Sequence, residues 1–278
     1  MSLELTRELS VLTVIRIGLL LASLWLPSLH AAPEKLPAGL EIGICDDQAE
    51  WPPFIYFERA SGKKGKQIVG YSVDVISRIL NEAKISYSVQ LLPWSRCVAE
   101  LKLGKRFQLT LNVSHNPERA RDFLFSRPYY RLHSYYFYSK HTFPDGLALA
   151  SAQALKRYRL CGVAGFNYVP YGLTPDDLDT SARSLLQLPP KLHRDRCDVF
   201  VEKLEVMAGY TSLGQDILAD FSLGYAPLPG IEPSPFHMMV SRQWPYASAL
   251  IELLDAGINQ LESKGELTRF KQRYRLSQ

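Results

Sequence analysis

The stretch from Asn112 to Arg119 holds residue types that could bind a small anion. Asn112 and Ser114 end a strand-like segment, and the start of a helix follows them. Ser114 offers a hydroxyl, the helix start offers free backbone N–H groups, and Arg119 offers a planar guanidinium. Because strand ends in α/β sheets point into ligand crevices, these groups could hold a carboxylate. The alternative is a surface arginine that pairs with Glu118 or Asp122.

Aromatic residues form a second group of candidates. Trp51 and Trp94 each follow a strand-like segment and lie beside prolines in loops. Tyr129 and Tyr130 end another aromatic stretch. Aromatic walls with a few polar groups are typical of small-molecule sites. The alternative for each of these residues is a place in the hydrophobic core.

Signatures of catalysis are absent from the sequence. It contains no G-x-S-x-G, H-E-x-x-H, P-loop or G-x-G-x-x-G motif. The six histidines lack the spacing of metal ligands, so we expect them to be surface or packing residues. We therefore predict no catalytic residue, no metal site and no cofactor.

Composition narrows the class of protein further. The hydrophobic fraction of 46% is that of a globular chain and excludes wholesale disorder. Thirty-two Lys and Arg stand against 28 Asp and Glu, which gives a net charge of only +4. The basic residues form no run, so we expect no nucleic-acid partner.

The N-terminus has the pattern of a secretion signal. Residues 17–26 are apolar and uncharged, Arg7 and Arg16 precede them, and the small residue Ala31 follows. The run is shorter than the ~20 residues that span a bilayer. We predict a signal peptide over 1–31 and a periplasmic mature protein, with a membrane anchor as the alternative.

Export changes the interpretation of the four cysteines, Cys45, Cys97, Cys161 and Cys197. An even number in an oxidising compartment favours two disulfides. No two cysteines have the close C-x-x-C spacing of a zinc site. Their number alone leaves three pairings open.

The elements that must position these residues alternate along the 278-residue chain. In the first half we predict a polar turn at 61–66, helices that begin at Ser72, Ser95 and Pro117, and strands at 40–45, 54–57, 85–92 and 107–113. This alternation predicts an α/β lobe with parallel strands.

The pattern begins again in the second half of the chain. We predict strands at 134–139, 159–163, 197–201 and 236–240, then helices around 250–261 and 267–274. Extended connectors near 131–140 and 227–235 separate two α/β segments.

Several motifs, in this order, resemble the family 3 periplasmic solute-binding proteins, the polar amino-acid type of bacterial ABC importers. They are Trp51-Pro-Pro-Phe54, Val69–Asp74, Pro93–Arg96, Asn116–Arg119, Phe125–Tyr130, Cys161–Gly165 and Arg196–Asp198. The resemblance covers essentially the whole mature chain. It implies an α/β, two-lobed periplasmic binding protein type II fold, with two crossover strands and a ligand cleft between the lobes. We expect lobe one over 33–132 plus 233–278, and lobe two over 133–232.

The resemblance also implies roles for single residues. Arg119 matches the arginine that clamps the ligand's α-carboxylate, Ser114 a hydroxyl donor, and Trp51 an aromatic wall. This chain has Gly165-Phe166-Asn167 where many members carry Gly-Thr-Thr, and Lys203 where they place an Asp for the α-ammonium. We therefore expect a ligand with a carboxylate but a different second group. The predicted ligand contacts are Trp51, Trp94, Asn112, Ser114, Arg119, Phe166, Asn167 and Glu202.

The function expected from this resemblance is solute capture without chemistry. The predicted partners are a small carboxylate-bearing molecule and an ABC permease in the inner membrane, and the protein is expected to be a monomer. One alternative is an exported enzyme on the same scaffold, such as a cyclohexadienyl dehydratase, with Glu202 and His115 as the acid/base pair. Another is a sensory module without a transporter.

The two-lobed organisation suggests one pairing of the cysteines. Cys45 and Cys97 fall in lobe one, whereas Cys161 and Cys197 fall in lobe two. We predict the disulfides Cys45–Cys97 and Cys161–Cys197, one in each lobe.

Overall fold

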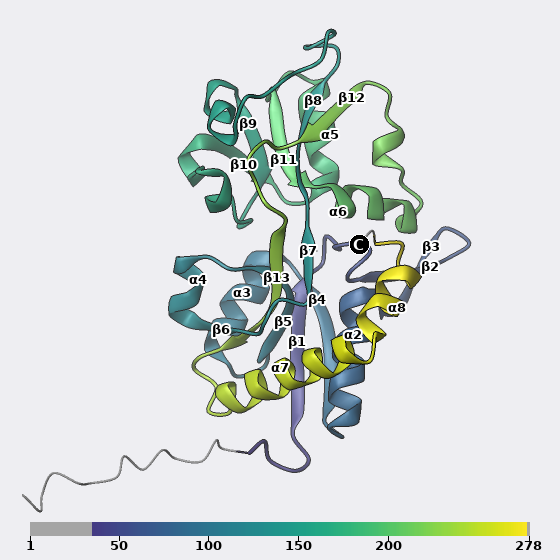
Figure 1. The fold of residues 1–278 in the computed structure, drawn as a ribbon, viewed down its shortest axis with the longest axis vertical. Helices are drawn as coiled ribbons and strands as arrows, with labels where there is room; N and C mark the ends of the chain where they lie inside the picture. The colour runs from purple at the N-terminus through teal and green to yellow at the C-terminus, as the bar shows by residue number, and fades with distance from the viewer. Residues whose placement is uncertain (1–34, 277–278) are drawn as a thin grey trace, which may run out of the picture. The chain divides into compact units, whose positions relative to one another are not determined.

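The computed structural model describes residues 35–276, so the predicted signal peptide over 1–31 lies outside the described residues. Two sheets organise the described part of the chain (Figure 1). We call the part built on the six-stranded sheet lobe one and the part built on the five-stranded sheet lobe two. The two-lobed α/β fold predicted from the sequence is confirmed.

The sheet of lobe one has the strand order β4-β1-β5-β13-β6, and β7 also pairs with β13. Its strands are β1 (Glu41–Asp47), β4 (Ser86–Leu92), β5 (Leu109–Ser114), β6 (Phe123–Phe125), β7 (Tyr130–Leu132) and β13 (Ser234–Ser241). β1 pairs in parallel with β4 and β5, whereas β13 is antiparallel to β5. The helices of this lobe are α2 (Tyr71–Glu82), α3 (Trp94–Leu103), α4 (Pro117–Asp122), α7 (Ala247–Ser263) and α8 (Glu266–Arg273).

The sheet of lobe two has the order β10-β9-β11-β8-β12. Its strands are β8 (Ser134–Ser139), β9 (Leu160–Val163), β10 (Leu178–Ala182), β11 (Val199–Lys203) and β12 (Leu223–Pro227). β9 pairs in parallel with β10 and β11, whereas β8 is antiparallel to β11 and β12. The helices α5 (Leu188–His193) and α6 (Leu204–Gly209) belong to this lobe, together with several short 3₁₀ helices.

The chain passes between the two sheets twice. β7 ends at Leu132 in the first sheet, and β8 begins at Ser134 in the second. The return runs from the end of β12 to the start of β13, and β13 pairs with β7 through Ser234 and Leu132 (Figure 1). The two crossings therefore lie side by side.

An aromatic column fixes both crossings to lobe one. Tyr130 of β7 stacks on Phe54, with ring centroids 4.2 Å apart, and on Phe236 of β13 at 5.0 Å. Phe236 in turn lies 6.0 Å from Trp51. Because aromatic pairs add to the free energy of area burial, this column holds the crossings against lobe one.

Three local predictions are wrong. The polar turn expected at 61–66 is confined to Ser61 and Gly62, because residues 63–69 form strand β3 (Lys63–Val69), which pairs with β2 (Tyr56–Ala60) as a hairpin. The helices predicted to begin at Ser72 and Ser95 each begin one residue earlier. α2 begins at Tyr71 after Gly70, whose φ is +135°, and α3 begins at Trp94 after Pro93, so neither serine is the N-cap. A Cβ on Gly70 would lie 2.2 Å from the carbonyl oxygen of Phe54, so the close backbone approach requires glycine.

Both predicted disulfides are present. Cys45 pairs with Cys97 and joins β1 to α3 within lobe one. Cys161 pairs with Cys197 within lobe two. Each bond therefore constrains one lobe and leaves the relation between the lobes free.

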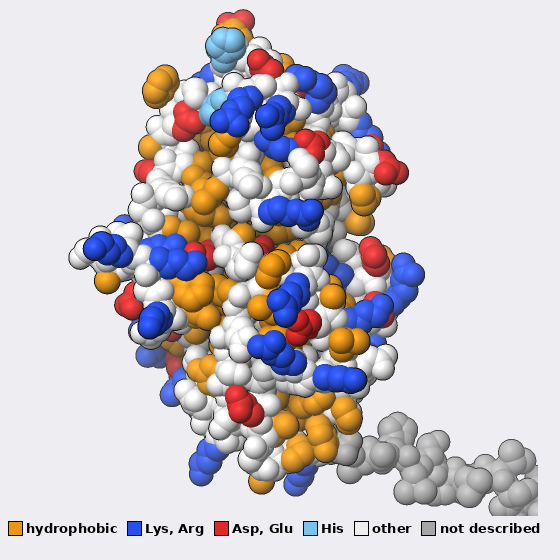
Figure 2. Space-filling model, turned by 180° about the vertical axis from the view of Figure 1, so that it is seen from behind, with side chains coloured by type: hydrophobic (Ala, Val, Ile, Leu, Met, Phe, Trp, Pro, Cys, Tyr) orange, Lys and Arg blue, Asp and Glu red, His pale blue; other side chains and the backbone are white. Residues whose placement is uncertain are grey.

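No helix of the described residues is long and apolar enough to cross a membrane. Figure 2 shows one face, on which Lys and Arg side chains are spread over both lobes and mixed with Asp and Glu. On this face the basic side chains do not gather into a stripe of the kind that tracks a nucleic-acid backbone.

Candidate ligand-binding cleft

A cavity lies where the carboxyl ends of parallel strands from both sheets meet. The volume of this cavity is about 60 Å³. The residues that line it are Asp46, Asp47, Trp51, Trp94, Asn112, Ser114, Arg119, Phe166, Asn167, Tyr168, Tyr171, Val201, Glu202, Lys203 and Phe236. All eight predicted ligand contacts are among them; that they bind a ligand stays a prediction.

Arg119 reaches the cavity from α4. The side chain of Asn116 caps this helix by accepting a hydrogen bond of 2.7 Å from the backbone N–H of Arg119. The guanidinium donates to the carbonyl oxygens of Ser114 at 3.0 Å and Gly165 at 2.9 Å. Burial lowers its pKa to about 10, so the group stays protonated at neutral pH.

The surface alternative for Arg119 is wrong. Among residues 35–276, no carboxylate oxygen lies within 4.0 Å of its guanidinium, and Asp122 pairs with Lys102 instead. The guanidinium lies 5.6 Å from the ring of Trp94, within cation–π range. A half-buried cation whose hydrogen-bond partners are all carbonyl oxygens is suited to a ligand carboxylate.

The cleft residues of the two lobes hydrogen-bond to each other. Trp94 Nε1 donates to the carbonyl oxygen of Gly165 at 3.1 Å, the same oxygen that Arg119 contacts. Asn167 Nδ2 donates to Ser114 Oγ at 3.0 Å and to the backbone oxygen of His115 at 3.1 Å. These contacts join the two lobes across the cleft, which is the arrangement of a closed cleft.

Aromatic rings from three parts of the fold form an apolar wall. Trp51 and Phe166 meet edge to face, with ring centroids 5.5 Å apart. Phe236, which sequence reasoning missed, extends the wall from β13. Tyr129 and Tyr130 do not line the cavity, because both are buried behind it.

The buried tyrosines position Asn112 instead. Tyr130 OH donates to Asn112 Oδ1 at 2.9 Å, and Ser72 Oγ donates to the same oxygen at 2.6 Å. Asn112 Nδ2 in turn donates to Asp46 Oδ2 at 2.9 Å. Asp46 also accepts from the N–H groups of Asp47 and Leu111. This network leaves the Asn112 side chain little freedom at the cavity wall.

Two carboxyl groups of the wall have few partners. Asp47 accepts from the N–H of Ala49 at 3.0 Å, and Glu202 accepts from the N–H of Lys203 at 2.9 Å. Burial raises the pKa of each group to about 7. Asp46 and Asp47 were missed, although they directly follow the strand predicted at 40–45, and that position is the signal that could have found them.

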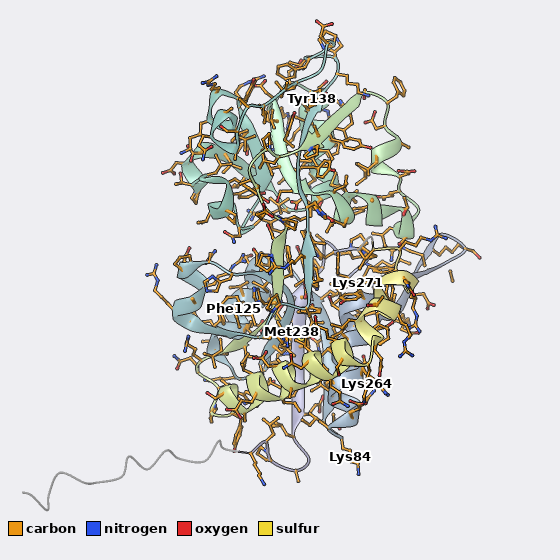
Figure 3. All side chains as sticks on the ribbon, in the orientation of Figure 1. Lys84, Phe125, Tyr138, Met238, Lys264 and Lys271 are labelled. Carbon is orange, nitrogen blue, oxygen red and sulfur yellow. A yellow bond between two sulfur atoms is a disulfide. The ribbon has the colours of Figure 1, made fainter. Side chains whose placement is uncertain are left out.

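His115 does not complete an acid/base pair with Glu202. Its ring packs on Phe125 at 4.9 Å between centroids, and Phe125 is labelled in lobe one in Figure 3. His115 is exposed and does not line the cavity. Within residues 35–276, no cluster of three or more His, Cys, Asp or Glu side chains could hold a metal ion.

Comparisons with known proteins identify the family and the fold. The family of bacterial extracellular solute-binding proteins, family 3, matches residues 40–277. A substrate-binding protein of an amino acid ABC transporter has a TM-score of 0.67 and 17% identity, covering 84% of this chain and 98% of that one. An amino acid ABC transporter substrate-binding protein from Streptococcus pneumoniae, bound to L-arginine, has a TM-score of 0.65 and 20% identity. This match covers 84% of this chain and 94% of that one.

A histidine kinase sensor domain with similarity to periplasmic binding proteins has a TM-score of 0.67 and 18% identity, covering 84% of this chain and 95% of that one. At such identities these structures share the fold. No curated protein matches the sequence.

Proposed function

This chain belongs to the bacterial extracellular solute-binding proteins of family 3, and from that premise we propose that it captures a small carboxylate-bearing solute for an ABC permease. The observation that carries the proposal is the Arg119 guanidinium, which faces the cleft without a carboxylate partner among residues 35–276. A planar guanidinium can make two parallel charge-assisted hydrogen bonds to one carboxylate. Ser114 and the aromatic wall would complete the site.

Closure of the cleft is the step that the permease would recognise. The bonds that Gly165 O and Asn167 Nδ2 form across the lobes exist only when the cleft is closed. A ligand that contacts both lobes has a higher affinity for this closed state, and that difference shifts the population toward it. The protein performs no chemistry in this proposal.

The proposal also includes the location of the protein, its oligomeric state and the bounds of its lobes. The signal peptide over 1–31 sends the chain to the periplasm, where it acts as a monomer. The lobes extend over 33–132 plus 233–278 and over 133–232. The family's extracellular location and the two disulfides support an oxidising compartment.

A thermal-shift screen against carboxylates and amino acids tests the function. A ligand at 100 times its dissociation constant adds ~2.7 kcal/mol to the free energy of unfolding, which gives a clear rise in Tm. We expect hits among carboxylates and none among cations that lack a carboxylate. A screen in which carboxylates give no shift contradicts the proposal.

Two further measurements separate the alternatives. Turnover of prephenate or arogenate would identify an enzyme, whereas the proposed binding protein leaves both unchanged. Genes for a permease and an ATPase beside this one would support an importer, and a sensor kinase gene there would support a sensory module instead.

A further inference from the structure

Lys203 is a buried cation at the wall of the cleft. It is the last residue of β11, is 6% exposed and lines the cavity. Its ammonium donates to three hydroxyl oxygens, those of Ser134 and Tyr171 at 2.8 Å and that of Ser234 at 2.7 Å. Ser134 begins β8 and Ser234 begins β13, so Lys203 joins both chain crossings.

The other buried lysine of this lobe shows what Lys203 lacks. Lys191 is 8% exposed, and its ammonium forms an ion pair with Asp179 and a hydrogen bond with Ser181. In contrast, no carboxylate oxygen of the described chain lies within 4.0 Å of the Lys203 ammonium. Its partners are all neutral hydroxyls.

Glu202 does not neutralise this charge fully. Burial raises the pKa of its carboxyl to about 7 even though the charge of Lys203 lowers it, so the carboxyl is not fully ionised at neutral pH. Burying an ion costs several kcal/mol unless a counter-charge repays it. With Arg119, the cleft holds two cations that have no carboxylate partner in residues 35–276.

We propose that Lys203 and the Tyr171 hydroxyl form a second anion subsite, so that the ligand is a small dicarboxylate without an α-ammonium. The proposal rests on the proposed function, since Arg119 holds the first carboxylate. All three N–H groups of Lys203 already donate to hydroxyl oxygens, so Lys203 contributes its charge to this subsite and Tyr171 contributes the donor. The Tyr171 oxygen lies 3.1 Å from Ser134 Oγ, and when Ser134 donates in that contact the Tyr171 proton can be donated to a ligand oxygen. An α-ammonium placed here would meet the like charge of Lys203 instead.

The other acidic groups of the cavity are compatible with a dianion. Asp46 is already occupied by hydrogen-bond donors from Asp47, Leu111 and Asn112. Asp47, like Glu202, has a pKa raised to about 7 by burial, so it can be protonated when an anion binds. A protonated carboxyl donates a hydrogen bond to the ligand and does not repel it.

Calorimetry with matched ligand pairs tests the inference on the parent protein. Glutarate and L-glutamate differ by the α-ammonium alone, as do succinate and L-aspartate. We expect at least one dicarboxylate to bind at least about tenfold more tightly than its amino-acid partner. Lys203→Met should weaken that dicarboxylate by roughly 25-fold or more, which is the range for removing one partner of a buried charged pair.

Two variants separate binding from folding. Tyr171→Phe keeps the ring and removes only the hydroxyl, and it should weaken the dicarboxylate by at least about threefold. Lys191→Met removes the other buried lysine, outside the cleft, and should leave affinity unchanged. If Lys203→Met does not fold, Tyr171→Phe alone decides.

The results distinguish this inference from the proposed function. Arg119-dependent binding in which each amino acid binds as tightly as its dicarboxylate would overturn the second subsite and leave the proposed function in place. Dicarboxylate binding that neither Lys203→Met nor Tyr171→Phe weakens would overturn it as well. If neither series nor any other carboxylate binds, both proposals are wrong.

Discussion

Replacing Arg119 with alanine is the sharpest test of the cleft. Of the five N–H donors of the guanidinium, one bonds Ser114 O and one bonds Gly165 O, which leaves donors for a ligand carboxylate. Removing one partner of a buried, hydrogen-bonded charge pair costs ~2–5 kcal/mol. At ~1.4 kcal/mol per decade, Arg119→Ala should weaken binding at least about 25-fold. The lost bond to Gly165 also weakens closure, so this figure is a lower bound.

The assay is calorimetric titration of the ligand found by screening. Arg121 lies two residues along the same helix and is exposed, so Arg121→Ala is the matched control and should bind as the parent does. Arg119→Lys should restore only part of the affinity, because an ammonium cannot form two parallel bonds. If Arg119→Ala bound the ligand as tightly as the parent, the carboxylate-clamp reasoning would be refuted.

Three further predictions follow from the same geometry. Gly165 has a φ of +77°, and a Cβ there would lie 3.0 Å from Trp94 Cδ1, so Gly165→Ala should weaken ligand binding several-fold and also lower Tm through backbone strain. Unchanged affinity would contradict this. The pKa of Glu202 is raised from 4.5 to about 7. The protonated carboxyl therefore stabilises the folded state at low pH, and this stabilisation, on the order of 3 kcal/mol, is lost as the pH rises from about 5 to about 7. Glu202→Gln should flatten that part of a thermal-unfolding pH series, and an unchanged slope would contradict this prediction. Replacing Cys45 and Cys97 by alanine should lower the free energy of unfolding by about 4 kcal/mol, because the disulfide closes a loop across a 52-residue separation and so reduces the entropy of the unfolded chain. A denaturant titration that finds no decrease in the free energy of unfolding would contradict this explanation.

The sequence was most informative where local pattern and tertiary structure agree. Strand β8 has the predicted bounds Ser134–Ser139, because its aromatic run has no helical alternative. Gly104 ends α3 with a φ of +63°, the left-handed conformation that a glycine directly after a helix favours. The start of α2 was missed since it depends on a contact between Gly70 and Phe54 from another segment. A close contact between two backbone segments cannot be recognised from the local sequence of either segment.

The two halves of the cleft also differ in how far local sequence pattern determines them. In lobe one the wall follows strand ends, and a polar side chain directly after a predicted strand can be found from sequence, as Asn112 and Ser114 were. In lobe two the environment of Lys203 depends on hydroxyls from β8, β13 and the 3₁₀ helix at 169–171, which are separated by up to about a hundred positions in the chain. A lysine with an unknown partner can be a surface residue, an ion pair or an anion site. Only the tertiary contacts decide among these. The ammonium donates to three hydroxyls and lies 5.3 and 5.9 Å from the ring centroids of Tyr171 and Phe236. The general capacity of the cleft for a carboxylate is therefore predictable from lobe one, whereas the group that distinguishes one carboxylate from another is set by lobe two.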